Sequence, residues 1–364
     1  MSSAAVPTTP FTIQHTPQVP EILAEVGCSL ALTTYQAGKV ILISSDGERL
    51  IQLPRTFEEP MGLAVDGDRM AVATKHSIVL LANEPRLAPT YPRQPDTYDA
   101  LFVPRSVHFA GALAVHDMVF TDQGLIGVNT LFSCLFQLDP RFSFRPVWKP
   151  PFVTALAPED RCHLNGLAAV DKEIRYATAL GRSDTAGGWR EGKERGGVLM
   201  HVPSGEILLD GLAMPHSPRV YDGVLYLLLS STGELVAVEG ARDGDGGDLR
   251  YEVVNRVPGF ARGMARAGDY VFVATSLIRK QHTFGDLELA GRKDVVCGVT
   301  ILHLPSGAIV GELKYLRSCE EIYDVQVLPG LKRPGLLGLH DETHRQALSM
   351  PEQTFWGRER EPDA

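Results

Sequence analysis

The stretch PGFARGMARAGDYVFVAT, residues 258–275, decides the fold of this chain. It opens with Pro-Gly, continues as Phe-Ala-Arg-Gly-Met-Ala-Arg-Ala, turns at Gly268–Asp269 and returns as the apolar run Tyr270–Thr275. Short runs of this kind with a period of two, bounded by Gly, Asp or Pro, are typical of β-strands. Similar runs occur at Lys39–Ile43 and Met70–Thr74, and only one helical turn is expected, near Pro20–Val26. The sequence therefore predicts an all-β chain.

The composition narrows the possible functions. The 364 residues are 44% hydrophobic and 22% charged, which is an ordinary balance for a globular protein. The net charge of −9 and the lack of Lys/Arg runs argue against nucleic-acid and anionic membrane partners. No stretch approaches the ~18 apolar residues of a membrane span, and the N-terminus lacks a secretory pattern, so we expect a cytoplasmic protein. Five widely spaced cysteines without a C-x-x-C pair predict reduced thiols.

Six units of similar length follow one another along the chain. Each begins with a polar or Pro/Gly-containing segment that leads into an apolar strand, a turn and further strands. One marker residue per unit gives spacings of 46 to 60 residues, and a four-stranded propeller blade needs roughly 40–50. The markers are Met61, His116, His163, His216, Arg262 and Ile322. The sequence thus predicts a six-bladed β-propeller, with two stacked β-sandwiches as the alternative.

The last unit contains too few strands of its own. Beyond Asp324 it offers Val325–Leu328 and Leu336–Leu339, while unassigned strands lie near the N-terminus at Ser29–Tyr35 and Val40–Ser44. We expect the N-terminal strands to complete the last blade, because closing the ring removes its open edges.

One domain between two tails is the predicted organisation. The propeller is expected at residues 19–346, and the ends, 1–18 and 347–364, are expected to be disordered. The loop 183–197 is too long for a simple turn, and Trp189 lies there among glycines. We expect this loop to act as a lid over the site.

Polar residues gather at the start of the units. The innermost strands of a propeller surround a central channel, so residues at equivalent starts converge at one mouth of that channel. Unpaired buried charge is costly, so such residues should be paired, metal-bound or facing a wet cavity. The candidates are Tyr35, Gln36, His116, Asp117, His163, Asn165, His216, Arg219, Arg262, Glu320, Glu321, Tyr323 and Asp324.

Three of these residues are histidines from three successive units. Three imidazoles with a vacant position are typical of a catalytic metal site. We expect His116, His163 and His216 to hold a divalent metal ion such as zinc, iron, copper or calcium. Asp117 or Asp324 would accept a hydrogen bond from a ring nitrogen that faces away from the metal. The alternative is that each histidine hydrogen-bonds a neighbouring strand.

The remaining candidates divide between substrate binding and acid–base work. Arg219 and Arg262 suit a carboxylate, sulfate or phosphate group, unless they pair internally with the acidic cluster. Neighbouring strand residues point to opposite faces, so only one of Glu320 and Glu321 can face the channel. The predicted substrate-binding residues are Arg219, Arg262, Asn165, Gln36, Tyr35 and Trp189. The predicted acid–base residues are Tyr323, Glu321 and Asp324.

The same segments carry a resemblance to a known family. They read T-Y-Q-A-G-K at 34–39, C-H-L-N-G-L-A at 162–168, M-P-H-S-P-R at 214–219 and E-E-I-Y-D-V-Q-V-L-P-G at 320–330. Through them the chain resembles a bacterial family of conserved hypothetical proteins over nearly its whole length, which implies no particular reaction. A looser similarity is to six-bladed propeller enzymes, namely the peptide-amidating lyase with its three zinc-binding histidines and the calcium-dependent lactonases.

These observations together predict an enzyme. It would act on a small anionic metabolite or a peptide side chain at the channel mouth, by metal-assisted lyase or hydrolase chemistry. The alternative is a non-catalytic binding module or a ligand sensor that serves a protein or small-molecule partner. The substrate, the reaction, the metal and the oligomeric state stay open at this stage.

Overall fold

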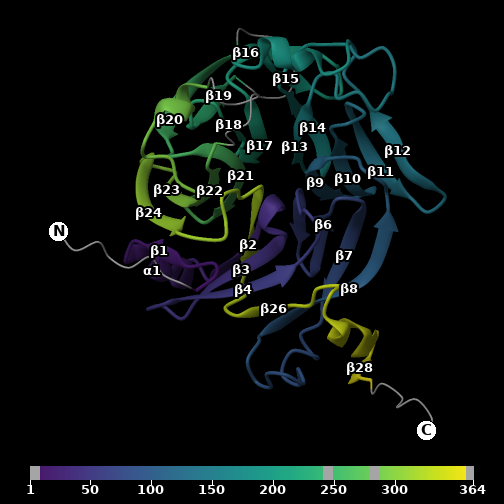
Figure 1. Ribbon diagram of the computed structural model, residues 1–364, viewed down its shortest axis with the longest axis vertical. Helices are drawn as coiled ribbons and strands as arrows, with labels where there is room; N and C mark the ends of the chain where they lie inside the picture. Colours follow the sequence, from purple (N-terminus) through teal and green to yellow (C-terminus); the bar gives the residue numbers. More distant parts are fainter. Residues whose placement is uncertain (1–8, 241–248, 279–286, 358–364) are drawn as a thin grey trace.

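The decisive stretch at residues 258–275 forms two neighbouring strands of one blade, β21 (Phe260–Ala267) and β22 (Tyr270–Ser276). The structure is a computed structural model that describes residues 9–240, 249–278 and 287–357. Its main sheets are arranged around one central axis as a six-bladed β-propeller (Figure 1). The predicted fold class is therefore confirmed.

Five blades are each built from four consecutive strands. The first contains β5 (Leu63–Asp66), β6 (Arg69–Ala73), β7 (Ser77–Asn83) and β8 (Ala100–Phe109). The second contains β9 (Val115–Thr121), β10 (Gly124–Asn129), β11 (Cys134–Asp139) and β12 (Phe142–Trp148). The third contains β13 (Leu164–Val170), β14 (Glu173–Ala179), β15 (Gly197–His201) and β16 (Ile207–Leu212). The fourth contains β17 (Pro215–Tyr221), β18 (Val224–Leu229), β19 (Glu234–Glu239) and β20 (Arg250–Arg256). The fifth adds β23 (Gly298–His303) and β24 (Ala308–Tyr315) to β21 and β22.

The sixth blade joins the two ends of the chain. Its innermost strand is β25 (Asp324–Pro329), and β2 (Cys28–Thr33), β3 (Lys39–Ser45) and β4 (Leu50–Thr56) follow outward. The predicted closure by N-terminal strands is confirmed. One prediction is wrong, because the strand expected at Leu336–Leu339 is absent except at Leu336. That residue ends β26 (Pro334–Leu336), which runs parallel to β8 at the edge of the first blade.

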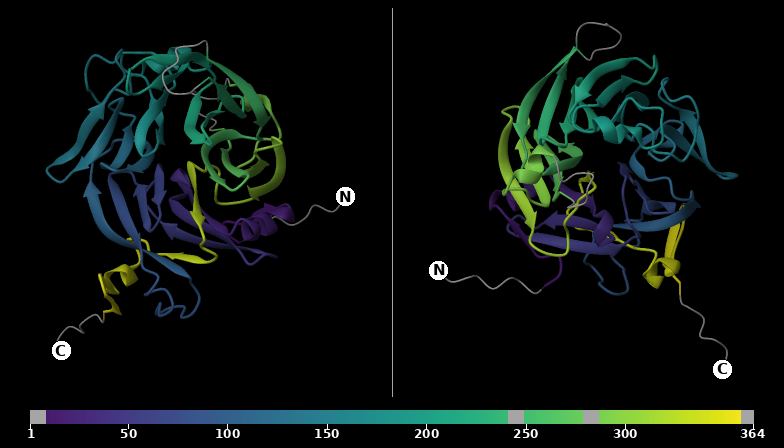
Figure 2. Two further views of the ribbon diagram at one scale, coloured as in Figure 1. Left: turned by 180° about the vertical axis from the view of Figure 1, so that it is seen from behind. Right: turned by 45° about the horizontal axis from the view of Figure 1, so that its top comes forward.

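Parts of both predicted tails are ordered. β1 (Ile13–His15) extends the fifth blade beyond β24, and α1 (Gln18–Glu25) follows it, covering the predicted helical turn. At the other end, β27 (Ala347–Met350) and β28 (Gln353–Trp356) form a hairpin outside the ring (Figure 2). The expectation of disorder is wrong for these segments, because each finds a sheet edge or an apolar neighbour. Residues 1–8 and 358–364 lie outside the described part.

Neighbouring blades pack through apolar faces. Between the sixth and first blades, Leu42 meets a cluster that includes Leu63 and Met70, all fully buried. All five cysteines are buried free thiols, as the sequence predicts. Among the described residues, no helix has the length and hydrophobicity needed to cross a membrane.

Halfway along the channel, the blades alternate between two kinds of residue. One blade carries a glycine, and the next carries a small polar side chain that accepts a hydrogen bond. Asp117 accepts the Leu167 N–H at 3.2 Å, and Asp324 accepts the Leu63 N–H at 3.1 Å, in each case across a blade junction. The glycines Gly62, Gly166 and Gly263 lie beside Asp117, Ser217 and Asp324. The blades can approach so closely because no Cβ separates them.

Replacing Gly263 by alanine is expected to destabilise the ring by about 2–3 kcal/mol. Gly263 has φ +71°, and a Cβ there would lie 2.6 Å from the backbone nitrogen of Val325. Gly67→Ala is the matched control, because Gly67 also has positive φ (+56°) but no neighbouring atom within 4 Å. Urea unfolding of both variants separates the clash from the backbone cost. Equal losses would contradict the close approach.

Candidate functional site

Side chains from the starts of the innermost strands meet at one end of the channel. The rings of His116 and His163 contact each other with centroids 4.8 Å apart, and His116 contacts Tyr323 at 5.1 Å. Arg262 covers the ring of Tyr323 at 4.8 Å, and the ring of His216 lies 5.9 Å from that of Phe260. We call this group the histidine mouth: His116, His163, His216, Arg262, Glu321 and Tyr323.

The wall of the second blade orients His116. Its Nδ1 lies 2.7 Å from the Thr130 hydroxyl and 2.9 Å from the Ala114 carbonyl. The Thr130 hydroxyl donates its own proton to the Leu164 carbonyl at 2.6 Å, so it accepts from the ring. The hydrogen-bond network therefore assigns the proton to Nδ1 and leaves a lone pair on Nε2.

His216 repeats this arrangement two blades further on. Its Nδ1 lies 2.7 Å from the Ser230 hydroxyl and 3.0 Å from the Met214 carbonyl, and Ser230 donates onward to Ala261. Burial is the main cause that lowers the pKa of both His116 and His216 well below the usual range. Both imidazoles are therefore neutral near pH 7, with Nε2 as a hydrogen-bond acceptor.

A carboxylate orients the third histidine. The Nδ1 of His163 lies 2.9 Å from Asp160, and the Trp189 indole donates to the same carboxylate at 2.8 Å. The ring of Trp189 also lies against His163, with centroids 4.4 Å apart. Asp160 is missed by the sequence analysis, although its place three residues before His163 is a usable signal. Trp189 is buried in the short helix Gly188–Gly192, so in this structure its side chain forms part of the wall beside His163.

Arg262 and Glu321 form a buried ion pair in the mouth. The Nη1 of Arg262 donates to Glu321 at 2.7 Å, and the guanidinium lies between the rings of Phe260 and Tyr323, 4.8 Å from each. The Nε of Arg262 is buried and has no hydrogen-bond partner among the described residues. Glu321 is buried while Glu320 is exposed, so it is Glu321 that faces the channel.

The arrangement does not supply the three ligands of a metal centre. Among the described residues, no group of three His, Cys, Asp or Glu side chains is placed to hold one ion. The rings of His116 and His163 pack edge to face at 83°, and the Nδ1 of each of the three histidines is held by the wall, which leaves Nε2 as the nitrogen available to a ligand. In the described part of the chain these side chains do not converge on one ion, so the metal ion stays a prediction and we derive no step through it.

Three other predicted residues lie around the mouth. Tyr35 and Gln36 belong to the short helix Tyr35–Ala37, where the ring of Tyr35 contacts Tyr323 at 5.9 Å and Gln36 is exposed. Asn165 is buried, donates to the Pro215 carbonyl at 2.9 Å and accepts from a threonine hydroxyl at 2.8 Å. The Asn165 amide nitrogen thus joins the third blade to the fourth, while the amide oxygen is used within the third blade.

Arg219 and Asp324 lie deeper than the mouth. Arg219 follows His216 by three residues, which is roughly 10 Å along a strand. It donates to both oxygens of Asp117, at 2.9 and 3.1 Å, so the expected partnership with Arg262 at one mouth is wrong. A strand bulge between His216 and Arg219 contributes to this placement. Burial and the charge of Asp117 raise the pKa of Asp324 to about 7.

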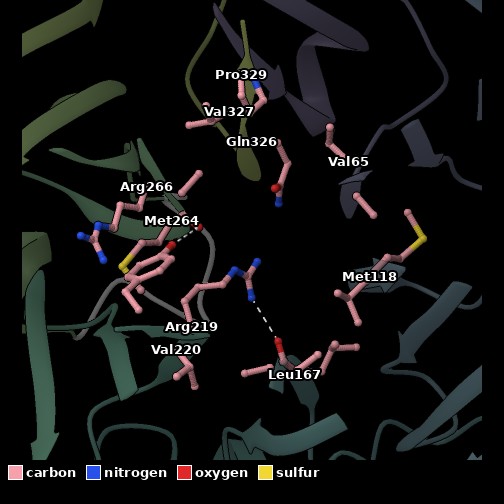
Figure 3. A pocket seen from close by; sticks show the side chains of 16 residues that line it. Val65, Met118, Leu167, Arg219, Val220, Met264, Arg266, Gln326, Val327 and Pro329 are labelled. Atoms are coloured by element: carbon pink, nitrogen blue, oxygen red, sulfur yellow. Dashed lines mark hydrogen bonds between the residues drawn. The ribbon is translucent and has the colours of Figure 1, made fainter. Parts of the chain in front are cut away.

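Arg219 faces a cavity of about 290 Å³ at the other end of the channel. Figure 3 shows its guanidinium directed into this space, opposite the carboxamide of Gln326. The cavity is lined by residues from the later parts of all six innermost strands. We call it the Arg219 cavity.

Comparison with known proteins identifies a family and a fold. Residues 17–337 match the family described as "Domain of unknown function (DUF4915)". No curated protein matches the sequence significantly. A chain of a solved nidogen/laminin complex is similar with a TM-score of 0.54 at 10% identity, over 84% of this chain and 99% of that one. A PQQ-bound aldose sugar dehydrogenase from Streptomyces coelicolor is similar with a TM-score of 0.44 at 13% identity, over 79% and 91%.

Proposed function

Because the chain belongs to the DUF4915 family, a domain of unknown function, we propose its activity from the histidine mouth alone. We propose that it is an enzyme that acts on a small anionic metabolite by acid–base chemistry of the lyase or hydrolase type. The observation that carries the proposal is the hydrogen bond between His163 and Asp160. It is the arrangement that a general base requires.

His163 is the proposed base. With its Nδ1 held by Asp160, the imidazole offers the Nε2 lone pair to a proton on the substrate or on a water molecule. Asp160 itself is held by the Trp189 indole, so the pair cannot easily turn away. Asp160 is the positioning residue, because it stabilises the positive charge that His163 acquires when it takes the proton.

Arg262 is the proposed contact for the anionic group. Its pairing with Glu321 fixes the guanidinium, and two aromatic rings cover its faces. The buried Nε–H has no acceptor among the described residues, and a buried donor without a partner costs free energy until it finds one. A carboxylate oxygen of a substrate would supply that acceptor.

His116 and His216 favour a hydroxyl-bearing substrate. Neutral imidazoles protonated on Nδ1 accept hydrogen bonds through Nε2 and donate none there. A hydroxy carboxylate presents both the donors that these rings need and the anionic group that Arg262 needs, and so does an ester or lactone that keeps a second carboxylate and a free hydroxyl. In hydrolysis, His163 would take a proton from water and return it to the leaving alkoxide. In loss of water, it would take a carbon-bound proton and return it to the leaving hydroxide, which departs as water.

The test is turnover of a defined panel of compounds. Small hydroxy carboxylates, together with esters and lactones that keep a free carboxylate and a hydroxyl, are followed by proton NMR with the wild type, His163→Gln, Asp160→Asn and Asp160→Glu. His201→Gln is the control, because His201 is an outer-strand histidine that bonds Ser204. We expect His163→Gln to lower kcat by about a hundredfold or more. Asp160→Asn should lower kcat with little change in KM, and Asp160→Glu should recover part of it.

Two results would contradict this proposal. If His163→Gln retains the activity of His201→Gln, His163 is not the base. If members of the panel bind saturably but none is converted, the mouth is better explained as the site of a ligand sensor.

A further inference from the structure

The Arg219 cavity takes no part in the proposed reaction. Its lining comes from the later halves of the innermost strands, whereas the histidine mouth is built from their starts. The layer that holds Asp117, Ser217 and Asp324 lies between the two. The cavity is therefore a separate space with its own chemistry.

The guanidinium of Arg219 uses only part of its donors within the protein. Nη1 and Nη2 form an end-on pair with the carboxylate of Asp117, and Nη1 also donates to the carbonyls of Leu167 and Pro218. Within the described part of the chain, Nε and the second proton of Nη2 form no hydrogen bond. These two donors lie side by side on one edge of the planar group, the edge that matches a carboxylate bidentately.

The rest of the cavity supplies further polar groups and an apolar wall. Two of these polar groups are already engaged, since the Tyr221 hydroxyl donates to the Met264 carbonyl at 3.4 Å and Arg266 pairs with Asp222 at 2.6 Å. The carboxamide of Gln326 points into the space across from Arg219 (Figure 3) and makes no hydrogen bond to another described residue. The wall is formed by apolar side chains: Val65, Met118, Leu167, Val220, Met264 and Val327. A pocket with a few converging polar groups in an apolar lining is typical of a small-molecule site.

The charges near Arg219 permit an anion below neutral pH. Asp117 neutralises the buried side of Arg219, and Tyr221 and Arg219 on β17 are the other titratable groups near Asp324. Asp324 has a pKa of about 7, raised by burial and by Asp117, so it is largely uncharged at pH 6. From the free guanidinium edge and the apolar wall, we propose that the Arg219 cavity binds a small carboxylate with a compact apolar body.

Benzoate is the probe, with benzamide as its uncharged counterpart of similar shape. Isothermal titration of the full chain at pH 6 should give saturable binding of one benzoate, and benzamide should bind at least about tenfold more weakly. Arg219→Lys keeps the charge beside Asp117 but lacks the bidentate edge, so it should weaken benzoate binding by a similar factor. Gln326→Leu should weaken it to a lesser extent, and Val65→Phe, which fills the cavity, should abolish it.

The Arg262→Gln/Glu321→Gln double variant separates this site from the histidine mouth. It removes both charges of the mouth together, so no buried charge is left unpaired. Unchanged benzoate binding in this variant supports the Arg219 cavity. If binding is lost there but kept in Val65→Phe, benzoate occupies the histidine mouth, which overturns this inference and leaves the proposed function standing. Equal affinity for benzoate and benzamide, or no saturable binding of benzoate, also overturns it.

Discussion

Replacing Arg219 by methionine is expected to destabilise the protein by about 3–5 kcal/mol. The substitution keeps much of the side-chain volume but removes both hydrogen bonds to Asp117. Asp117 is 3% exposed, so its carboxylate would be left charged and without its cation in the centre of the ring. The free energy of unfolding, measured in urea at pH 7 against the wild type, gives the loss directly.

Arg266→Met is the matched control for this prediction. Arg266 lies on the next blade and pairs with Asp222, whose side chain is 79% exposed. An ion pair with an exposed partner contributes only about 0–1 kcal/mol, so this variant should lose little. Adding Asp117→Asn to Arg219→Met should recover part of the stability, because the unpaired charge is then gone. Equal losses in the two methionine variants would show that the Arg219–Asp117 pair has no special role.

Replacing Asp324 by asparagine is expected to remove most of the stability loss that the wild type undergoes between pH 5 and pH 8, although the amide can accept only one of the two backbone N–H groups that the carboxylate accepts. The pKa of Asp324 is about 7 in the folded state and about 3.9 in an unfolded chain, so the folded state binds the extra proton between these values. The wild type therefore loses stability as the pH rises through this range, by about 4 kcal/mol in full. The asparagine side chain carries no charge and avoids that loss.

The two buried histidines, His116 and His216, change stability with pH in the opposite sense to Asp324. Their contribution must therefore be distinguished from that of Asp324. Their pKa is lowered on folding, so the unfolded state binds more protons below about pH 6.5 and stability falls as the pH falls. Both variant and wild type contain these histidines, so the difference between their unfolding free energies isolates Asp324. Urea unfolding at pH 5, 6, 7 and 8 should show this difference growing with pH. A constant difference would mean that Asp324 does not titrate in this range.

The blades were predictable from sequence because their signals are local. A polar or Pro/Gly segment before each apolar run marks the start of an innermost strand, and His116, His163 and His216 lie at or next to three such starts. Ring closure followed from counting strands, since β25 alone could not complete the last blade. Turns and period-two runs depend on neighbouring residues, which a single sequence displays.

The site was predicted less well because it depends on strand register and on long-range partners. Arg219 and Arg262 seemed equivalent in the sequence, but bulges in β17 and β21 change their depth in the channel. Asp117 lies 102 positions from Arg219 and Glu321 lies 59 from Arg262, so neither pairing follows from spacing. Asp160 was overlooked because it lies in a loop, outside the repeating strand pattern.

The pairing of β25 with β2 has a consequence for how the protein is made. β2 leaves the ribosome early, and all six of its residues are buried in the finished ring. Until the C-terminal segment is synthesised, that strand presents an unpaired apolar edge, which is a hazard for aggregation. The same late segment supplies Glu321, Tyr323 and Asp324. A chain that terminates early therefore lacks both its ring closure and part of its site, so incomplete products carry an exposed edge and no complete binding centre.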